Sequence, residues 1–199
     1  MFAVIAGGLL LAARSARAQT SVHTHDGFYL HLEGGVGSMS SSASQAGLDV
    51  ELSGGTGEFA AGIGGALTPN LVLAGQFWGT NVSSPKVKMN GTTLGSASGS
   101  LGLSGIGLEI TYYVMPHNFY VSAVPSFGTL TASSGGSSYS TKSGFAIKLA
   151  AGKEWWVSDD WGIGLNLQYA HSSNQDSDLA GAPTWGTSWF GVAFSATYN

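Results

Sequence analysis

The chain of 199 residues contains no cysteine. Disulfides and a thiolate nucleophile are therefore excluded, and a zinc site would have to use histidine and carboxylate ligands alone. Only 9% of the residues are charged, against about 25% in an average soluble domain. After the N-terminal stretch no apolar run approaches the roughly 20 residues that a membrane-spanning helix needs. The composition thus excludes a helical membrane protein and is unusual for a soluble domain.

The N-terminus has the pattern of an export signal. Residues 2–13 are apolar, and Ala16-Arg17-Ala18 offers a small-x-small cleavage site. We therefore expect residues 1–18 to be a signal peptide. Its only arginines follow the apolar run instead of preceding it, which a start codon placed too far downstream would explain. Residues 19–26 then form a periplasmic N-terminal tail, and residues 27–199 form one domain.

Charge narrows the choice of partners. The formal net charge is −4, and removal of the signal peptide, which carries Arg14 and Arg17, makes the chain more acidic. An acidic chain argues against nucleic acid as a partner. In the tail, His23, His25 and Asp26 could bind a metal loosely, but a solvated tail is the simpler interpretation. We predict no metal site and no cofactor.

The C-terminal segment alternates at the period of a β-strand. Phe190, Val192, Phe194, Ala196 and Tyr198 share one face, and small or polar residues occupy the other. The same alternation recurs about eight times, in segments near residues 27–36, 57–67, 71–79, 101–114, 119–129, 144–157 and 161–169 and at the C-terminus. Bulky faces opposite small, polar faces indicate a closed barrel with lipid outside and a narrow polar lumen inside. The predicted fold is all-β, an eight-stranded up-and-down antiparallel transmembrane β-barrel.

Two places disturb this alternation. Leu101 and Leu103 are out of register with the apolar face of residues 106–114, so we predict a bulge near Ser104 and Gly105. Pro125 lacks a backbone N–H and should occupy a bulge or a weakly bonded position.

The connections alternate in length. Short turns fall at residues 68–70, 115–118 and 158–160, whereas long Ser/Gly-rich loops are expected at residues 38–56, 81–99, 132–143 and 172–186. Outer-membrane barrels have short periplasmic turns and long external loops. The pattern therefore predicts four extracellular loops and two periplasmic termini.

The strand count, the turn order and a last strand with a penultimate aromatic, Tyr198, resemble the small eight-stranded outer-membrane barrels of the OmpA transmembrane domain and OmpX type. The last strand, residues 190–198, also resembles the sorting signal that ends such barrels. The resemblance implies a porin-like, monomeric barrel at the Gram-negative cell surface. It implies insertion into the cell outer membrane by the barrel-assembly machinery, and contact with outer-membrane lipid and lipopolysaccharide. It does not fix a function, since related barrels include structural anchors, adhesins, channels and lipid A enzymes.

Charged side chains are expected inside the barrel. The predicted polar network of the lumen consists of Glu33, Glu58, Glu109, Lys148 and Glu154, with His31 beside it. Charges in a side-chain-filled lumen must pair or be hydrated. A hydrated plug is the simpler interpretation, and a path for protons or ions is the alternative.

One motif suggests catalysis. His171-Ser172-Ser173-Asn174 resembles the His-x-Ser-Asn motif of outer-membrane lipid A deacylases, which would make Ser173 the nucleophile and His171 its base. No glutamate follows in the chain, so only Asp176 or Asp178 could orient the histidine. We therefore predict a noncatalytic surface barrel with a structural or surface-interaction role. A deacylase-like enzyme and a conduit for small hydrophobic molecules remain as alternatives.

Overall fold

The computed structural model describes residues 24–176 and 181–199. All regular structure in these ranges is β-strand, and the strands pair antiparallel. Within the described residues there is no helix of the length and apolarity needed to cross a membrane. The signal peptide predicted at residues 1–18, and His23 in the tail, lie outside the described residues.

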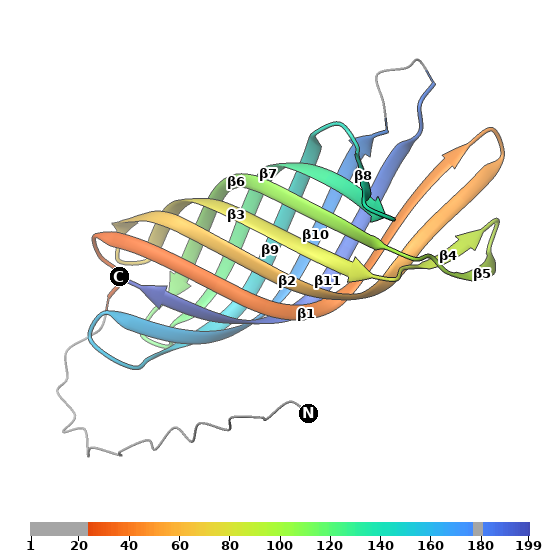
Figure 1. The fold of residues 1–199 in the computed structure, drawn as a ribbon. Helices are drawn as coiled ribbons and strands as arrows, with labels where there is room; N and C mark the ends of the chain where they lie inside the picture. Colours follow the sequence, from red (N-terminus) through yellow and green to blue (C-terminus); the bar gives the residue numbers. More distant parts are fainter. Residues whose placement is uncertain (1–23, 177–180) are drawn as a thin grey trace, which may run out of the picture.

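Eight long strands form a closed wall (Figure 1). They are β1 (Phe28–Gln45), β2 (Leu48–Thr68), β3 (Leu71–Ser83), β6 (Ser100–Val114), β7 (Phe119–Ser134), β9 (Gly144–Trp156), β10 (Trp161–Gln175) and β11 (Thr184–Tyr198). Each pairs with its sequence neighbour in the wall, and β1 pairs with both β2 and β11. This closure confirms the predicted eight-stranded up-and-down antiparallel barrel.

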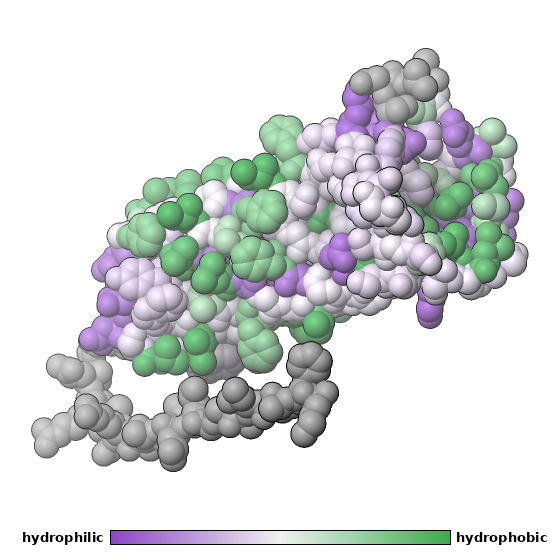
Figure 2. Space-filling view, viewed as in Figure 1, coloured by the Kyte–Doolittle hydropathy of each residue, from purple (hydrophilic) through white to green (hydrophobic). Residues whose placement is uncertain are grey.

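The outer face of the wall carries an apolar band, seen in Figure 2 as the green surface over one part of the strands, with paler, more polar surface beyond it. Phe127 and Phe194 remain 73% and 71% exposed. On every wall strand the outward apolar series ends at a bulky residue, beyond which outward positions carry polar residues or glycine. These last residues, which we call the boundary ring, are Val36, Phe59, Phe77, Ile106, Phe127, Phe145, Tyr169 and Phe190. The ring marks one edge of the lipid-facing band.

The two ends of the barrel differ. At one end, the turn end, the three short connections lie where the sequence predicts them, between β2 and β3, β6 and β7, and β9 and β10. At the other end, the hairpin end, the expectation of long irregular loops is wrong for most of the chain concerned. β1 and β2 continue to a tight turn at Ala46-Gly47, where both residues have positive φ.

Three short strands complete the hairpin end. β4 (Lys86–Met89) and β5 (Thr92–Ser96) form a hairpin whose first strand pairs with β2, and β8 (Ser137–Ser140) folds back on β7. Above the boundary ring the outward positions carry polar residues or glycine, so the outward face no longer shows an apolar alternation. The backbone hydrogen bonds between the strands continue nevertheless. Hydrophobic periodicity in the sequence therefore does not reveal these strand segments.

The predicted bulge at Ser104 and Gly105 is absent. β6 keeps one register with β3 through this region and pairs in register with β7 on either side of a short gap. Leu101 and Leu103 break the outward pattern because they face the lumen, where they are 2% and 1% exposed. The β6–β7 pairing is interrupted between Gly107/Ser126 and Ile110/Ala123, next to Pro125. The proline thus occupies a weakly bonded position without a change of register.

Phe194→Arg tests the lipid-facing wall. The side chain projects from the middle of the outward face of β11, and an arginine at the bilayer midplane costs about 2–4 kcal/mol of folding free energy. Phe194→Leu, which stays apolar, is the matched control and should cost less. The measurement is urea unfolding in lipid vesicles followed by tryptophan fluorescence. Equal stability of the Arg and Leu variants would remove Phe194 from the lipid.

Candidate functional site

The lumen near the hairpin end is filled by apolar side chains. Trp78 and Trp189 are each 1% exposed, and around them pack Met39, Ala60, Val82, Leu101, Leu103, Val124, Leu130, Ala146 and Ala170. Both indole N–H groups are satisfied, by Ser126 Oγ at 3.0 Å and Thr56 Oγ1 at 2.7 Å. We call this set the outer cluster. It corrects the expectation of a small, polar interior for this part of the barrel.

A second cluster fills the lumen near the turn end. Tyr29, Tyr113 and Tyr120 are buried there with Val72 and Ala74. Side chains therefore fill the lumen at two heights, as expected for an eight-stranded barrel.

His25 lies at the turn end and is fully buried, which contradicts the picture of a solvated tail at this position. Its ring stacks on Tyr113 with 3.6 Å between centroids. Nδ1 lies 2.7 Å from Asn199 Oδ1, and Nε2 lies 2.9 Å from Asn118 Oδ1. His25, from the segment ahead of β1, therefore joins the last residue and a wall turn across the mouth of the barrel.

The middle of the lumen holds the charged residues. Lys148 donates from Nζ to Glu33 Oε2, and both side chains are at most 2% exposed. The other oxygen of Glu33 accepts from Asn166 Nδ2 at 2.9 Å and from Gln168 Nε2 at 3.0 Å. Full pairing of this kind is what allows an ion pair to be buried.

Glu109 is the second centre of this network. Its Oε1 accepts from Tyr29 and Thr111 at 3.1 and 2.9 Å and lies 3.1 Å from His31 Nδ1. Its Oε2 accepts from Gln76 Nε2 at 2.8 Å. A carboxylate with so many partners is held in one orientation, which favours a structural role over proton carriage.

The two remaining predicted lumen carboxylates are less well partnered. Glu154 accepts from Thr197 at 2.7 Å and from Tyr113 at 3.4 Å. Glu58 is 8% exposed, and within the described residues its Oε1 has no hydrogen-bond partner. Over residues 24–176 and 181–199, no group of three or more His, Asp or Glu side chains is arranged to hold a metal ion.

The structure gives His171 of the deacylase-like motif a hydroxyl partner from outside the motif. His171 and Ser173 both lie on the exposed face of β10, the first and second outward positions beyond Tyr169 of the boundary ring. However, the hydroxyl beside His171 Nδ1 is that of Ser188 on β11, at 3.0 Å. Asp176 accepts from Trp185 Nε1 at 3.2 Å through its carboxylate. Asp178 lies outside the described residues.

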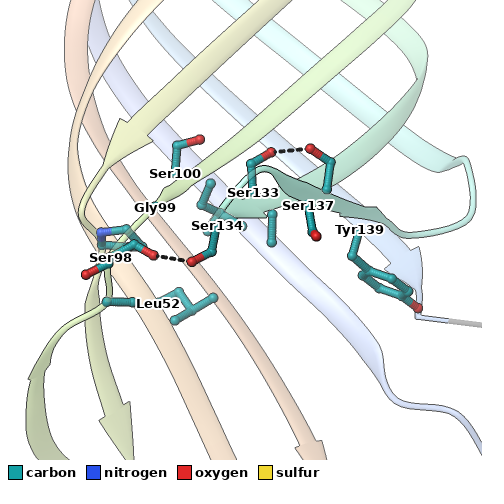
Figure 3. Close-up of a pocket in the computed structure, with 13 residues that line it drawn as sticks. Leu52, Ser98, Gly99, Ser100, Ser133, Ser134, Ser137 and Tyr139 are labelled. Carbon is teal, nitrogen blue, oxygen red and sulfur yellow. Dashed lines mark hydrogen bonds between the residues drawn. The ribbon is translucent and has the colours of Figure 1, made fainter.

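A pocket of about 350 Å³ opens at the hairpin end between β7–β8 and the segment that leads from β5 into β6 (Figure 3). Hydrogen bonds from Ser134 Oγ to Ser98 O and between Ser133 and Ser138 shape its edge. We call it the rim pocket; its lining contains no ionisable residue except Tyr139 and consists of Leu52, Pro85, Ala97, Ser98, Gly99, Ser100, Leu101, Ala132, Ser133, Ser134, Ser137, Ser138 and Tyr139.

The rim pocket continues toward the lumen. A smaller cavity of about 60 Å³ shares Leu52, Leu101, Ala132 and Tyr139 with it and reaches Leu130 of the outer cluster. Sequence reasoning missed both this pocket and the position of His25. The pocket depends on how three hairpins lean together, and a lone histidine before a strand carries no periodic signal.

Comparison with known proteins gives a fold and no closer relationship. No protein-family profile matches the chain, and no curated protein sequence matches it. Among solved structures, the outer membrane protein OprG from Pseudomonas aeruginosa is 12% identical with a TM-score of 0.51, over 89% of this chain and 99% of that one. The outer membrane protein AlkL in lipid bilayers is 14% identical with a TM-score of 0.50, over 93% and 95%. Neisserial surface protein A is 17% identical with a TM-score of 0.48, over 83% and 95%.

The fold is that of the small eight-stranded outer-membrane β-barrels. The closed wall and its apolar band agree with that class, because only a barrel without free edges can cross lipid with strands. The chain is an outer-membrane barrel protein.

Lys148→Met tests the charge network. Loss of the ammonium group leaves the buried Glu33 without its lysine partner and with the His31 ring, whose Nε2 lies 3.7 Å from Oε1, beside it. This should cost up to about 3–5 kcal/mol of folding free energy. In the double variant Lys148→Met/Glu33→Gln the unpaired charge is gone, so most of that loss should be recovered. Urea unfolding in vesicles measures each variant, with Glu33→Gln as the fourth corner of the cycle. Strictly additive losses would mean that the two side chains act independently.

Proposed function

We propose that the protein is a noncatalytic outer-membrane barrel that presents its hairpins at the cell surface for interaction with other molecules. The filled lumen carries this proposal. Two apolar clusters and a paired charge network occupy the interior from end to end of the lipid-facing band, so the wall serves as a rigid mount. The hairpin end supplies the accessible surface.

The orientation belongs to the same proposal. The short turns and the described termini lie at one end, where His25 and Asn199 meet, and the long hairpins lie at the other. We expect the hairpins outside the cell, the termini in the periplasm, a monomer in the membrane, and insertion by the barrel-assembly machinery through β11. Lipopolysaccharide then surrounds the outer part of the wall.

The surroundings of His171 support the noncatalytic assignment. Ser188 is its cross-strand neighbour in a regular ladder, where the backbone N–H groups bond to the adjacent strands. An acyl-transfer site needs free N–H donors aimed at the oxyanion and a third group that orients the histidine. The described part of the chain provides neither beside this pair.

A second candidate function follows from the rim pocket. Its uncharged lining and its contact with the outer cluster would suit a small, uncharged hydrophobic molecule entering from outside. Passage through the barrel would require the outer cluster to open.

Ala132→Trp tests this second candidate function. If the rim pocket binds hydrophobic molecules, naphthalene should quench the tryptophan fluorescence of the wild type saturably, and the variant, whose pocket is filled, should not show this saturable quenching.

Surface labelling tests the orientation. Epitope tags inserted at Gly91, between β4 and β5, and at Gly136, between β7 and β8, should be labelled by antibody on intact cells. Both glycines sit at exposed turns with positive φ and no neighbour within 4 Å of an added Cβ, and such loop tips accept insertions. A tag at Asp159, in the turn between β9 and β10, should be labelled only after permeabilisation. The reverse pattern would invert the topology.

Lipid A mass spectra test the absence of catalysis. Cells with and without the protein should have the same lipid A acylation. The contrary result is release of a hydroxylated fatty acid by the purified protein. If this release were abolished by the single variant His171→Ala, and also by Ser173→Ala or by Ser188→Ala, the deacylase-like alternative would be established.

A further inference from the structure

The outer wall is hollowed beside the boundary ring. A depression of about 520 Å³ extends across four adjacent strands, β2, β3, β6 and β7. We call it the wall groove; the outward-facing positions that line it are Gly57, Phe59, Gly79, Asn81, Gly102, Ser104 and Thr131. It differs in place from the rim pocket, with which it shares no lining residue.

Strand register explains the hollow. One cross-strand row runs Phe59, Gly79, Ser104, and the next row outward runs Gly57, Asn81, Gly102, Thr131. In each row glycines therefore alternate with residues that carry a side chain, and most glycines of one row also lie next to a side chain of the other row. Each glycine leaves bare backbone where a strand in contact with lipid normally carries a side chain, so the groove is floored by peptide groups.

The position of the groove relative to the membrane indicates which kind of molecule it contacts. Phe59 belongs to the boundary ring, and the other lining positions lie immediately beyond the ring on the same four strands. The groove therefore spans the edge of the lipid band and faces the headgroup layer, not the acyl chains alone and not the open medium. In an outer membrane with the proposed orientation, this layer consists of the sugars of lipopolysaccharide.

The chemistry of the groove agrees with a neutral saccharide. Phe59 is 52% exposed and offers an aromatic face, while Asn81, Ser104 and Thr131 offer an amide and two hydroxyls that donate and accept. The ionisable residue along the groove, Glu58, turns its side chain into the barrel. An aromatic surface bordered by a few uncharged polar groups is the lining that orients an uncharged polar ring. Among the described residues that line the groove none is cationic, so the phosphate groups that lipopolysaccharide carries lie outside the groove and only an uncharged ring face enters it.

We propose that the wall groove binds a sugar ring of an outer-leaflet glycolipid, that is, the saccharide portion of lipopolysaccharide next to the acyl chains. Phe59 covers the apolar face of the ring, and Asn81, Ser104 and Thr131 bind its hydroxyls. This inference rests on the orientation given under the proposed function, but not on any role of the hairpins.

The glycines provide a sharp test because they can be filled from outside. A Cβ at Gly57 meets nothing within 4 Å, and a Cβ at Gly79 makes only ordinary contacts at 3.7 and 3.8 Å. Gly57→Leu should therefore fold and fill the groove. Gly186→Leu is the matched control, because Gly186 also faces outward beyond the boundary ring, has an equally open Cβ position, and lies on β11 away from the groove.

The measurement is native mass spectrometry of protein in nanodiscs of phosphatidylethanolamine with or without lipopolysaccharide. Wild type and Gly186→Leu should retain one lipopolysaccharide molecule, and Gly57→Leu should retain at least about fivefold less. Asn81→Ala, which removes hydrogen bonds without filling space, should also lower retention by about fivefold. Heat-modifiable gel mobility confirms that each variant is folded, and Asn81→Ala keeps the test decisive if Gly57→Leu does not fold.

Two results would overturn the proposal. Equal retention of lipopolysaccharide by all four proteins would show that the groove is not its site. Retention of phosphatidylethanolamine that equals that of lipopolysaccharide and is lost equally in Gly57→Leu would assign the groove to acyl chains and exclude the sugar. If surface labelling inverts the topology while Gly57→Leu still lowers lipopolysaccharide retention, the groove binds the glycolipid but the orientation is wrong.

Discussion

Closure of the backbone ladder is the constraint on which the rest of the structure depends. Lipid offers no partners for peptide N–H and C=O groups, so every strand in the bilayer must pair on both sides. The pairing of β1 with β11 meets this requirement. It also explains why the lumen is narrow, since eight strands enclose only enough space for side chains. Glycine is required where strands approach closely: a Cβ at Gly144 would lie 1.9 Å from Ser173 O.

The narrow lumen in turn decides what the charged residues can do. Glu33 and Lys148 come from distant parts of the chain, yet in the lumen they pair with each other, and Glu33 is also held by neighbouring amides and lies 3.7 Å from His31 Nε2. Clusters of buried apolar and aromatic side chains lie on either side of this layer. The interior therefore stabilises the wall, and the surfaces left for recognition are the hairpin end, the rim pocket and the wall groove.

Sequence reasoning succeeded where one physical rule governed many residues. The alternation of bulky and small side chains identified all eight wall strands, because the strand period is fixed by geometry. It failed where both faces of a strand meet the same environment, as in β4, β5 and β8. It also failed at Leu101 and Leu103, where the assumption of a polar lumen turned an ordinary inward position into a predicted bulge.

The sequence by itself determined that this chain is a barrel in lipid, because hydrophobic period and charge content depend only on the order of residues. Only the tertiary structure decided which side chains meet. Barrel closure brings His25 to Asn199 across the turn end and places Ser188, not Ser173, beside His171. Strand register likewise aligns Gly57, Gly79 and Gly102 into one groove. Register is a relation between strands, so no single segment of sequence contains it.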